Sequence, residues 1–268
     1  MDQEILKKIQ DIDYDALIAF KQFCDEHNIS FFLRGGSVMG AVKYSNFIPW
    51  DDDIDVAVPR EDYKRLLRYI KDKKLDDRFI INSYLYNENL HCYFPRMVLS
   101  EDERIKQGLP KNTNLGLHII DIFPLDGAPN NSIHRKLYII HVYILRALAS
   151  LGTHYSGEWK NMHSKKQELL IKVLRKIGFE RIFPQRRVYK SLDRLYTKDD
   201  WRKQKYAGTI TASQFAKEIF PKDVWGKGCL FPIRDEMFMV PEKYDEYLKK
   251  LYGNNYLNEE PEHKKSHL

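Results

Sequence analysis

The sequence predicts an α/β (α+β) protein, with a mixed sheet and flanking helices in its first half and a helical, basic second half. Three observations lead to this class. Apolar residues in the first half recur at the spacing of amphipathic helices. Short apolar runs that end at glycine or acidic residues separate these helices, as strands would. In the second half, long helical patterns rich in Lys and Arg follow.

The amino-acid composition excludes several classes of protein. The 268 residues are 43% hydrophobic and 31% charged, which supports a buried core and excludes a globally disordered chain, a collagen-like repeat and a multispanning membrane protein. Cys24, Cys92 and Cys229 lie far apart and suggest neither a disulfide framework nor a CxxC metal site. This use of cysteine fits a reducing cytosol, so we expect a cytoplasmic protein. The first residues mix charged and aliphatic side chains, so we expect no secretory signal.

The first half begins with a helix. Apolar residues at spacings of three to five predict this helix over residues 2–27, with a break near Asp13. The apolar run 30–33 is a predicted strand that stops at Gly35 and Gly36, and Ser37 then caps a short helix to residue 44. The remaining predicted elements are a strand over 53–58, a helix over 60–73, and strands over 78–84, 91–99 and 116–123.

The second half differs in charge. Residues 133–151 are apolar but are interrupted by basic side chains, so they predict a buried or interfacial helix instead of a membrane span. Residues 160–205 hold 15 Lys or Arg and 5 Asp or Glu, a net charge of +10, so the rest of the chain, whose total is +6, carries −4. A last helix is predicted over 243–251. We expect a catalytic core over 1–130 and, packed on it, a helical basic region with a C-terminal block over 131–268.

A glycine turn and a run of aspartates carry the predicted chemistry. Residues two apart on a strand face the same way, so Asp53 and Asp55 would project their carboxylates together while Ile54 enters the core. Such a pair needs a cation, and oxygen ligands combined with substrate phosphates suit Mg²⁺. The Gly35-Gly36-Ser37 turn opens a helix with unobstructed backbone N–H groups, which suits the phosphates of a nucleotide.

A third carboxylate would allow two metals to be held, or would take a proton from an attacking hydroxyl. Asp121 is the best candidate because it is a lone charge in an apolar strand, where an unpaired carboxylate would be costly. His118 lies three residues earlier and is expected to face the other way and pack in the core. Lys43 and Arg96 could neutralise phosphate, although a solvated lysine and a structural arginine account for them equally well.

Two other interpretations of the aspartates stay open. Asp51, Asp53 and Asp55 have the one-three-five spacing of an EF-hand loop. The sixth position of that loop would be Val56 instead of glycine, and the twelfth would be Asp62 instead of glutamate, which argues against it. An acidic surface turn is the simplest alternative, and the glycine turn that precedes the aspartates argues against it.

These residues resemble a known family. The run Leu33-Arg-Gly-Gly-Ser-Val-Met-Gly-Ala-Val-Lys-Tyr-Ser-Asn-Phe-Ile-Pro-Trp-Asp-Asp-Asp-Ile-Asp-Val is similar to the signature of the LicD family, whose members are phosphocholine transferases and relatives with a nucleotidyltransferase fold. Residues 120–126 and 240–253 are similar to two further blocks of that family, in the same order. The resemblance covers residues 30–65, 116–128 and 225–268, and the basic middle carries no recognised motif.

The resemblance implies a nucleotidyltransferase-like sheet and a set of site residues. It implies that Asp53 and Asp55 are metal ligands and that Asp121 is the third carboxylate. It also implies that the Gly35-Gly36-Ser37 turn meets the phosphates of the donor. Many relatives carry threonine where this sequence has Ser37, and because serine still offers a hydroxyl we expect little change.

The reaction that the resemblance implies is a phospho-alcohol transfer that depends on Mg²⁺ or Mn²⁺. Phosphocholine from CDP-choline is the first choice of donor group, and CDP-ribitol and CDP-glycerol are substitutes. The acceptor would be a hydroxyl of a lipid-linked glycan, such as a teichoic acid or lipopolysaccharide precursor, and CMP would be released. Asp121 would help to deprotonate that hydroxyl.

Two other functions stay open. The same carboxylates could transfer a nucleotidyl group instead. The basic segment could make this a nucleic-acid-binding protein, but it carries no recognised binding motif, so we expect no nucleic-acid partner. With a lipid-linked acceptor, that segment and the helix over 133–151 would instead contact an anionic membrane surface.

Overall fold

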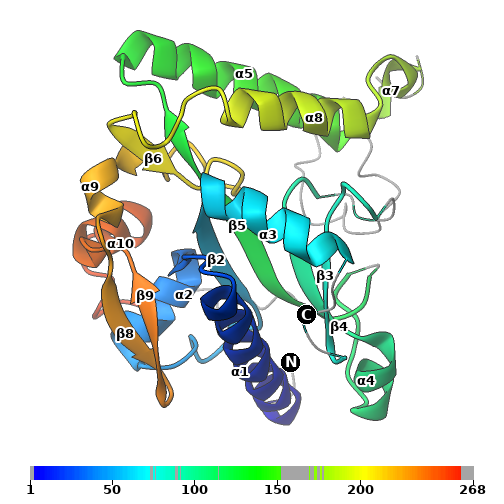
Figure 1. Ribbon diagram of the computed structural model, residues 1–268, viewed down its shortest axis with the longest axis vertical. Coiled ribbons are helices and arrows are strands. Elements are labelled where there is room, and N and C mark those ends of the chain that lie inside the picture. Colours follow the sequence, from blue (N-terminus) through cyan, green and yellow to red (C-terminus); the bar gives the residue numbers. More distant parts are fainter. Residues whose placement is uncertain are drawn as a thin grey trace.

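The computed structural model contains a mixed sheet covered by helices (Figure 1). It describes residues 3–72, 75, 77–87, 90, 92–113, 115–151, 169, 172, 173, 176 and 178–260. Parts of several predicted elements lie outside the described residues, namely residues 2, 73 and 91 and most of 160–177 in the basic segment. Among the described residues, the mixed sheet with flanking helices that the sequence predicts is confirmed.

The centre of the sheet is a parallel pair of strands. Strand β2 (Ile54–Pro59) runs parallel to β5 (His118–Ala128), and the register places Asp55 opposite Asp121. Three antiparallel strands flank this pair: β1 (Phe32–Leu33) beside β2, and β4 (Arg96–Leu99) followed by β3 (Phe79–Asn82) beside β5. Because the middle strands are covered on both faces, their apolar residues are nearly continuous.

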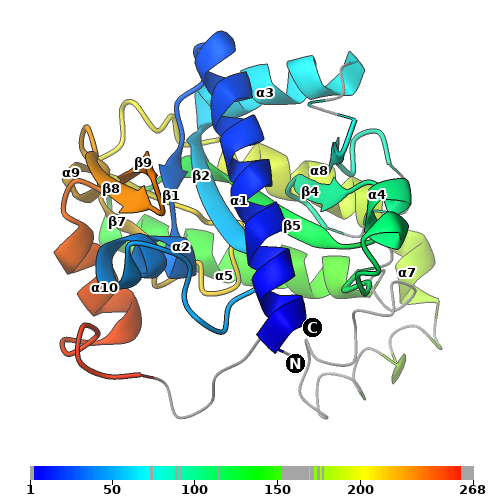
Figure 2. The ribbon, with the colours of Figure 1, turned by 90° about the horizontal axis from the view of Figure 1, so that it is seen from below.

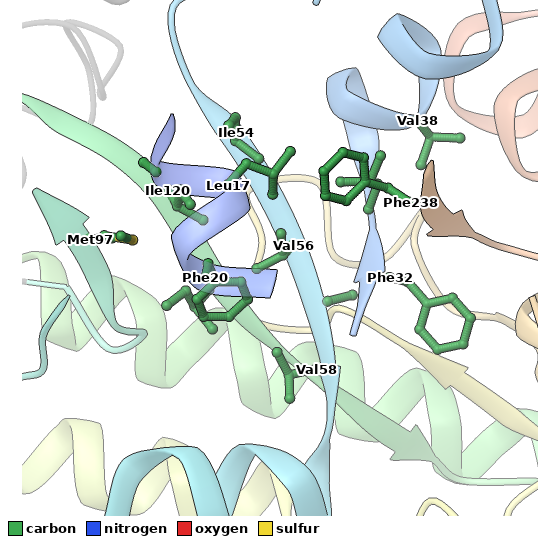
Figure 3. Close-up of a cluster of buried hydrophobic side chains, with 14 of the residues drawn as sticks. Leu17, Phe20, Phe32, Val38, Ile54, Val56, Val58, Met97, Ile120 and Phe238 are labelled. Atoms are coloured by element: carbon green, nitrogen blue, oxygen red, sulfur yellow. The ribbon is translucent and has the colours of Figure 1, made fainter. Parts of the chain in front are cut away.

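Helix α1 (Gln3–Glu26) packs across the sheet and supplies much of the core. Figure 2 shows α1 crossing in front of β2 and β5. Its inward face contacts the central strands, so that Leu17 and Phe20 lie beside Ile54, Val56 and Ile120, as Figure 3 shows. The predicted break near Asp13 is wrong, because the helix continues through that residue, which is buried. The other helix of the first half that covers the sheet is α3 (Arg60–Asp72).

The glycine turn forms a short helix. Helix α2 (Gly35–Met39) continues directly into a π-helical turn over Gly40–Tyr44. The prediction that Ser37 caps this helix is wrong, because the helix begins at Gly35, and the Arg34 carbonyl accepts from the N–H groups of Ser37 and Val38. Ser37 therefore lies inside the helix, and its hydroxyl is available for another contact.

The second half adds strands that the sequence analysis missed. Strand β6 (Tyr206–Gly208) pairs with the far end of β5, and β7 (Phe220–Pro221) pairs with β6. A separate hairpin joins β8 (Cys229–Ile233) to β9 (Glu236–Val240). The second half therefore joins the sheet of the first and packs into the same core.

The remaining helices surround this frame. Helices α5 (Ser132–Ser150) and α8 (Gln185–Tyr196) lie side by side across one end of the molecule (Figure 1) and share a second apolar cluster. The shorter helices are α4 (Glu101–Lys106), α7 (Phe179–Ile182), α9 (Lys222–Trp225) and α10 (Tyr244–Tyr252). None of the helices in the described part of the chain combines the length and the apolar character needed to cross a membrane.

Candidate active site

Two predicted carboxylates meet at the centre of the sheet. Asp55 on β2 is the register partner of Asp121 on β5. The Asp55 side chain is 23% exposed and that of Asp121 is 10% exposed, whereas Ile54 is fully buried. The sequence placed both residues on strands, and the structure shows that these strands are neighbours. Two carboxylates are therefore placed side by side at a nearly buried position.

Arg34, the residue before the glycine turn, binds Asp55. Its Nη1 donates to Asp55 Oδ2 at 2.9 Å, and its other donors reach Glu218 Oε2 at 3.2 Å and Oε1 at 2.5 Å. The Thr209 hydroxyl donates a hydrogen bond to the same Glu218 carboxylate. Arg34 and Glu218 are both buried, so this ion pair fixes the guanidinium beside Asp55.

Asp121 has its own basic partners. Arg96 Nε lies 3.0 Å from Asp121 Oδ1, and His118 Nε2 lies 2.9 Å from the same oxygen. The prediction that His118 faces away from Asp121 is wrong. A β-bulge in β5 is the reason, because Met97 and Val98 pair with Ile120 and His118. The extra residue in β5 turns His118 to the face that carries Asp121.

The glycine turn lies directly against the carboxylates. Gly35 has φ of +53°, and a Cβ added there would lie 3.1 Å from Asp55 Oδ2, so glycine is required for both reasons. The Gly35 N–H donates to the Tyr247 hydroxyl at 2.9 Å. Ser37 Oγ accepts from the Asp55 N–H at 2.9 Å. The turn and β2 are thus held together next to the acidic pair.

The preceding aspartates enlarge the negative region. A Cβ added at Gly36 would lie 3.0 Å from Asp51 Oδ2, so Asp51 also borders the turn. Burial, together with Asp55 and Asp52, raises the pKa of Asp51 to about 7. On α1, burial and the nearby Asp53 raise the pKa of Asp13 well above its usual range. Asp53 therefore interacts with the charges of Asp51 and Asp13.

Asp55 and Asp121 differ in how readily each carboxyl group ionises. Burial raises the pKa of Asp55 to about 6, with Asp121 adding to the rise and Arg34 opposing it. Burial would also raise the pKa of Asp121, but Arg96 and His118 outweigh it and hold that pKa at about 2. Asp121 is therefore a stable anion, and Asp55 is the member whose ionisation costs more free energy.

The structure brings together some of the predicted site residues. Asp55, Asp121, Arg96, Gly35 and Ser37 are linked through the contacts above. In the described parts of the chain, no three His, Cys, Asp or Glu side chains are arranged to hold a metal ion, and the trio of Asp53 with the register pair stays a prediction.

Lys43 makes contacts elsewhere. Its Nζ donates to the carbonyls of Tyr256 and Glu259 at 3.2 and 3.0 Å. These contacts fix the C-terminal segment to the π-helical turn. A role for Lys43 in phosphate binding stays a prediction.

Sequence reasoning missed two residues near the carboxylates. Glu218 lies far along the chain in a segment without a recognised motif, and no spacing signal could have connected it to Arg34. Tyr247 lies in the C-terminal block that resembles the family, so its position was a usable signal. Asp51 was considered only for the EF-hand spacing, although its place beside a glycine turn was visible in the sequence.

Comparison with known proteins agrees with this geometry. Residues 28–126 match the family model described as LicD/FKTN/FKRP, nucleotidyltransferase domain. They form a LicD-family domain. The match contains the glycine turn, the aspartate run, Arg96 and Asp121, so the paired strands β2 and β5 are the centre of that domain.

Individual relatives extend the similarity. The chain is 26% identical to the lipopolysaccharide cholinephosphotransferase LicD of Haemophilus influenzae over 260 residues, which cover 96% of this chain and 93% of the relative. It is also 31% identical over 68 residues to an uncharacterized protein of Rickettsia prowazekii, covering 23% of this chain and 26% of that protein. The similarity to the Haemophilus protein therefore includes the second half.

Proposed function

We propose that this protein transfers a phospho-alcohol from a CDP-activated donor to a hydroxyl of a cell-surface glycan precursor, with release of CMP. CDP-choline is the first donor to test, and a lipid-linked lipopolysaccharide or teichoic acid precursor at the cytoplasmic face is the acceptor. The observation that carries the proposal is the glycine turn packed against Asp55, in register with Asp121. The Haemophilus relative, a lipopolysaccharide cholinephosphotransferase by name, supports the choice of donor and acceptor.

The chemistry of the donor atoms fits Mg²⁺ or Mn²⁺. Only carboxylate oxygens are offered by Asp55 and Asp121, with Asp53 as the further ligand, and oxygen ligands favour hard cations. Mg²⁺ commonly uses one or two carboxylates together with substrate phosphates, so the register pair is a sufficient protein contribution. When bound, the ion would neutralise negative charge on the diphosphate of the donor.

The surrounding residues have distinct parts in this proposal. The backbone of the Gly35-Gly36-Ser37 turn would approach the phosphates, because glycine leaves no side chain in the way. Arg96 holds Asp121 in its ionised form, which suits a ligand better than a group that must accept a proton at neutral pH. We therefore propose Asp121 as a ligand first, and keep its part in deprotonating the acceptor as a secondary role.

A second candidate is nucleotidyl transfer with the same carboxylates. The family model is described as a nucleotidyltransferase domain. In that reaction the acceptor would attack the α-phosphorus of a nucleoside triphosphate, instead of the phosphorus that carries the alcohol in a CDP-alcohol. The products distinguish the two reactions. Phospho-alcohol transfer releases CMP, whereas nucleotidyl transfer from a nucleoside triphosphate releases pyrophosphate.

The test is donor competition. The protein is incubated with equal amounts of CDP-choline, CDP-ribitol and CDP-glycerol, a lipopolysaccharide or teichoic acid precursor, and Mg²⁺, and CMP release is followed. We expect acceptor-dependent release, fastest with CDP-choline, that EDTA abolishes and Mg²⁺ or Mn²⁺ restores. Faster release from another donor would overturn the choline assignment, and no acceptor-dependent release from any donor would overturn the transferase proposal.

Variants assign the site residues. Asp53→Asn, Asp55→Asn and Asp121→Asn should each reduce CMP release by at least about a hundredfold, because each removes a charge proposed to stabilise the transition state. Asp25→Asn is the matched control, since Asp25 is a highly exposed carboxylate on α1 that pairs with Lys21. Near-normal turnover in any of the three would remove that residue from the site.

A further inference from the structure

Helix α5 carries two apolar faces, and only one of them is packed. The inner face contacts α8 and the neighbouring loops through Tyr138, Val142 and Ala149. The opposite face is exposed and has the helical spacing of a continuous stripe. The stripe, which we call the α5 stripe, consists of Ile133 (66% exposed), Leu137 (59%), Ile140 (54%) and Ile144 (55%).

The charged side chains of α5 itself are all basic. The 19 residues of α5 contain no Asp or Glu, and exposed Lys136 and His134 lie beside the stripe. Helix α8, which packs against the inner face of α5, carries the half-exposed Asp193, and it and the turn after it also expose cations. These are Arg187, Lys190, Arg194 and Lys198, which recur at the spacing of one helical face.

This combination distinguishes between possible partners. Four large apolar side chains, each more than half exposed along one face of a helix, indicate an interaction surface. A symmetric contact with a second copy would place the basic residues of the two copies close together, which is unfavourable. An anionic lipid surface instead attracts the cations while its acyl region accepts the apolar side chains.

We propose that the α5 stripe docks on an anionic lipid surface, with α5 lying in the plane of the interface. The helix is interrupted by basic residues and does not reach the length and apolar character of a membrane span, which agrees with an interfacial helix. This inference rests on the proposed function in one respect: docking would bring the site to a lipid-linked acceptor. Lipid binding itself requires neither donor nor metal.

The test is sedimentation of the full chain with vesicles, without nucleotide or metal. One vesicle contains phosphatidylcholine alone, and the other contains phosphatidylcholine mixed with phosphatidylglycerol. We expect binding to the mixed vesicles that weakens as salt is added, because salt screens the cations. Equal binding to both vesicles, or binding to neither, would overturn the proposal.

Variants locate the surface. Leu137→Ser combined with Ile140→Ser should weaken binding to the mixed vesicles by at least about tenfold, since each loses apolar area at the interface. Leu230→Ser is the matched control, because Leu230 is 57% exposed on β8 and should bind like the wild type. Circular dichroism checks that the double variant is folded. Binding unchanged in the double variant would overturn the assignment to α5.

Two further measurements separate lipid docking from catalysis and from self-association. Asp55→Asn should bind vesicles like the wild type, so a failed transferase assay would not affect this result. Analytical ultracentrifugation compares the wild type with the double variant. A dimer that the double variant abolishes, together with unchanged vesicle binding, would show that a second copy covers the α5 stripe and would overturn the lipid assignment.

Discussion

Arg60 offers a direct test of how much a buried ion pair in this fold stabilises it. Its Nε and Nη2 donate to the two carboxylate oxygens of Asp126, each at 2.5 Å, and its Nη1 donates to Asp193 at 2.9 Å. The side chains of Arg60 and Asp126 are 7% and 1% exposed, whereas that of Asp193 is 50% exposed. One arginine thus binds a buried and a half-exposed carboxylate.

Asp126 and Asp193 should differ in how much they contribute to the free energy of unfolding. In Asp126→Asn the guanidinium stays buried and keeps only the half-exposed Asp193 as a charged partner, which costs about 3 kcal/mol of unfolding free energy. In Asp193→Asn the lost pair is screened by solvent, and the cost should stay within about 1 kcal/mol. The same arginine serves both, so burial of the partner is the main difference between the variants.

Urea unfolding of the two variants and the wild type measures these free energies. The midpoint should fall clearly in Asp126→Asn and only slightly in Asp193→Asn, with similar slopes in all three. A loss below about 1 kcal/mol in Asp126→Asn, or equal losses in the two variants, would refute the reasoning that burial makes this pair important. The ion pair with Arg60 would then not explain why an aspartate stands at position 126, in the segment 120–126 that resembles the family.

Further predictions concern the site. Glu218→Gln should lower CMP release, because Arg34 loses a buried anionic partner and shifts toward Asp55; unchanged CMP release from a folded variant would contradict this. The pKa of Asp121 is about 2, below its value in the unfolded chain, so Asp121 stabilises the fold above about pH 4 and this stability is lost as the pH falls toward 2. Urea midpoints measured across that range should therefore fall more in the wild type than in Asp121→Asn. Gly35→Ala should lower both stability and activity, since φ of +53° disfavours a side chain, and a normal urea midpoint would contradict this.

The sequence was sufficient for the central part of the fold because its signals are local. The alternating and apolar runs of β2 and β5 predicted strands, and the lone charge of Asp121 in an apolar run predicted that it would face other polar groups. The parallel pairing and register of the two strands came from the structure. The spacing of Asp53 and Asp55 was equally local, yet it could not tell that Asp53 would interact with Asp51 and Asp13 on a different element.

What the sequence could not show depends on contacts between distant segments or on irregular geometry. The two-residue strand β7 has no period to detect. The bulge that turns His118 toward Asp121 changes the simple alternation of a strand, and a bulge has no reliable sequence signal. The sequence-based side assignment of His118 therefore failed for a geometric reason, while that of Ile54 succeeded.

The contact between Arg34 and Glu218 shows why the glycine-turn motif alone does not build the site. The motif supplies Arg34 and Asp55, but a buried guanidinium whose only anionic partner was the partly exposed Asp55 would be costly. Glu218 supplies the missing charge from the segment between β6 and β7, and β6 is held on the far end of β5. The second half of the chain therefore stabilises the position of Arg34 beside the carboxylates, which is a physical reason why the similarity to the Haemophilus relative should extend beyond the matched domain.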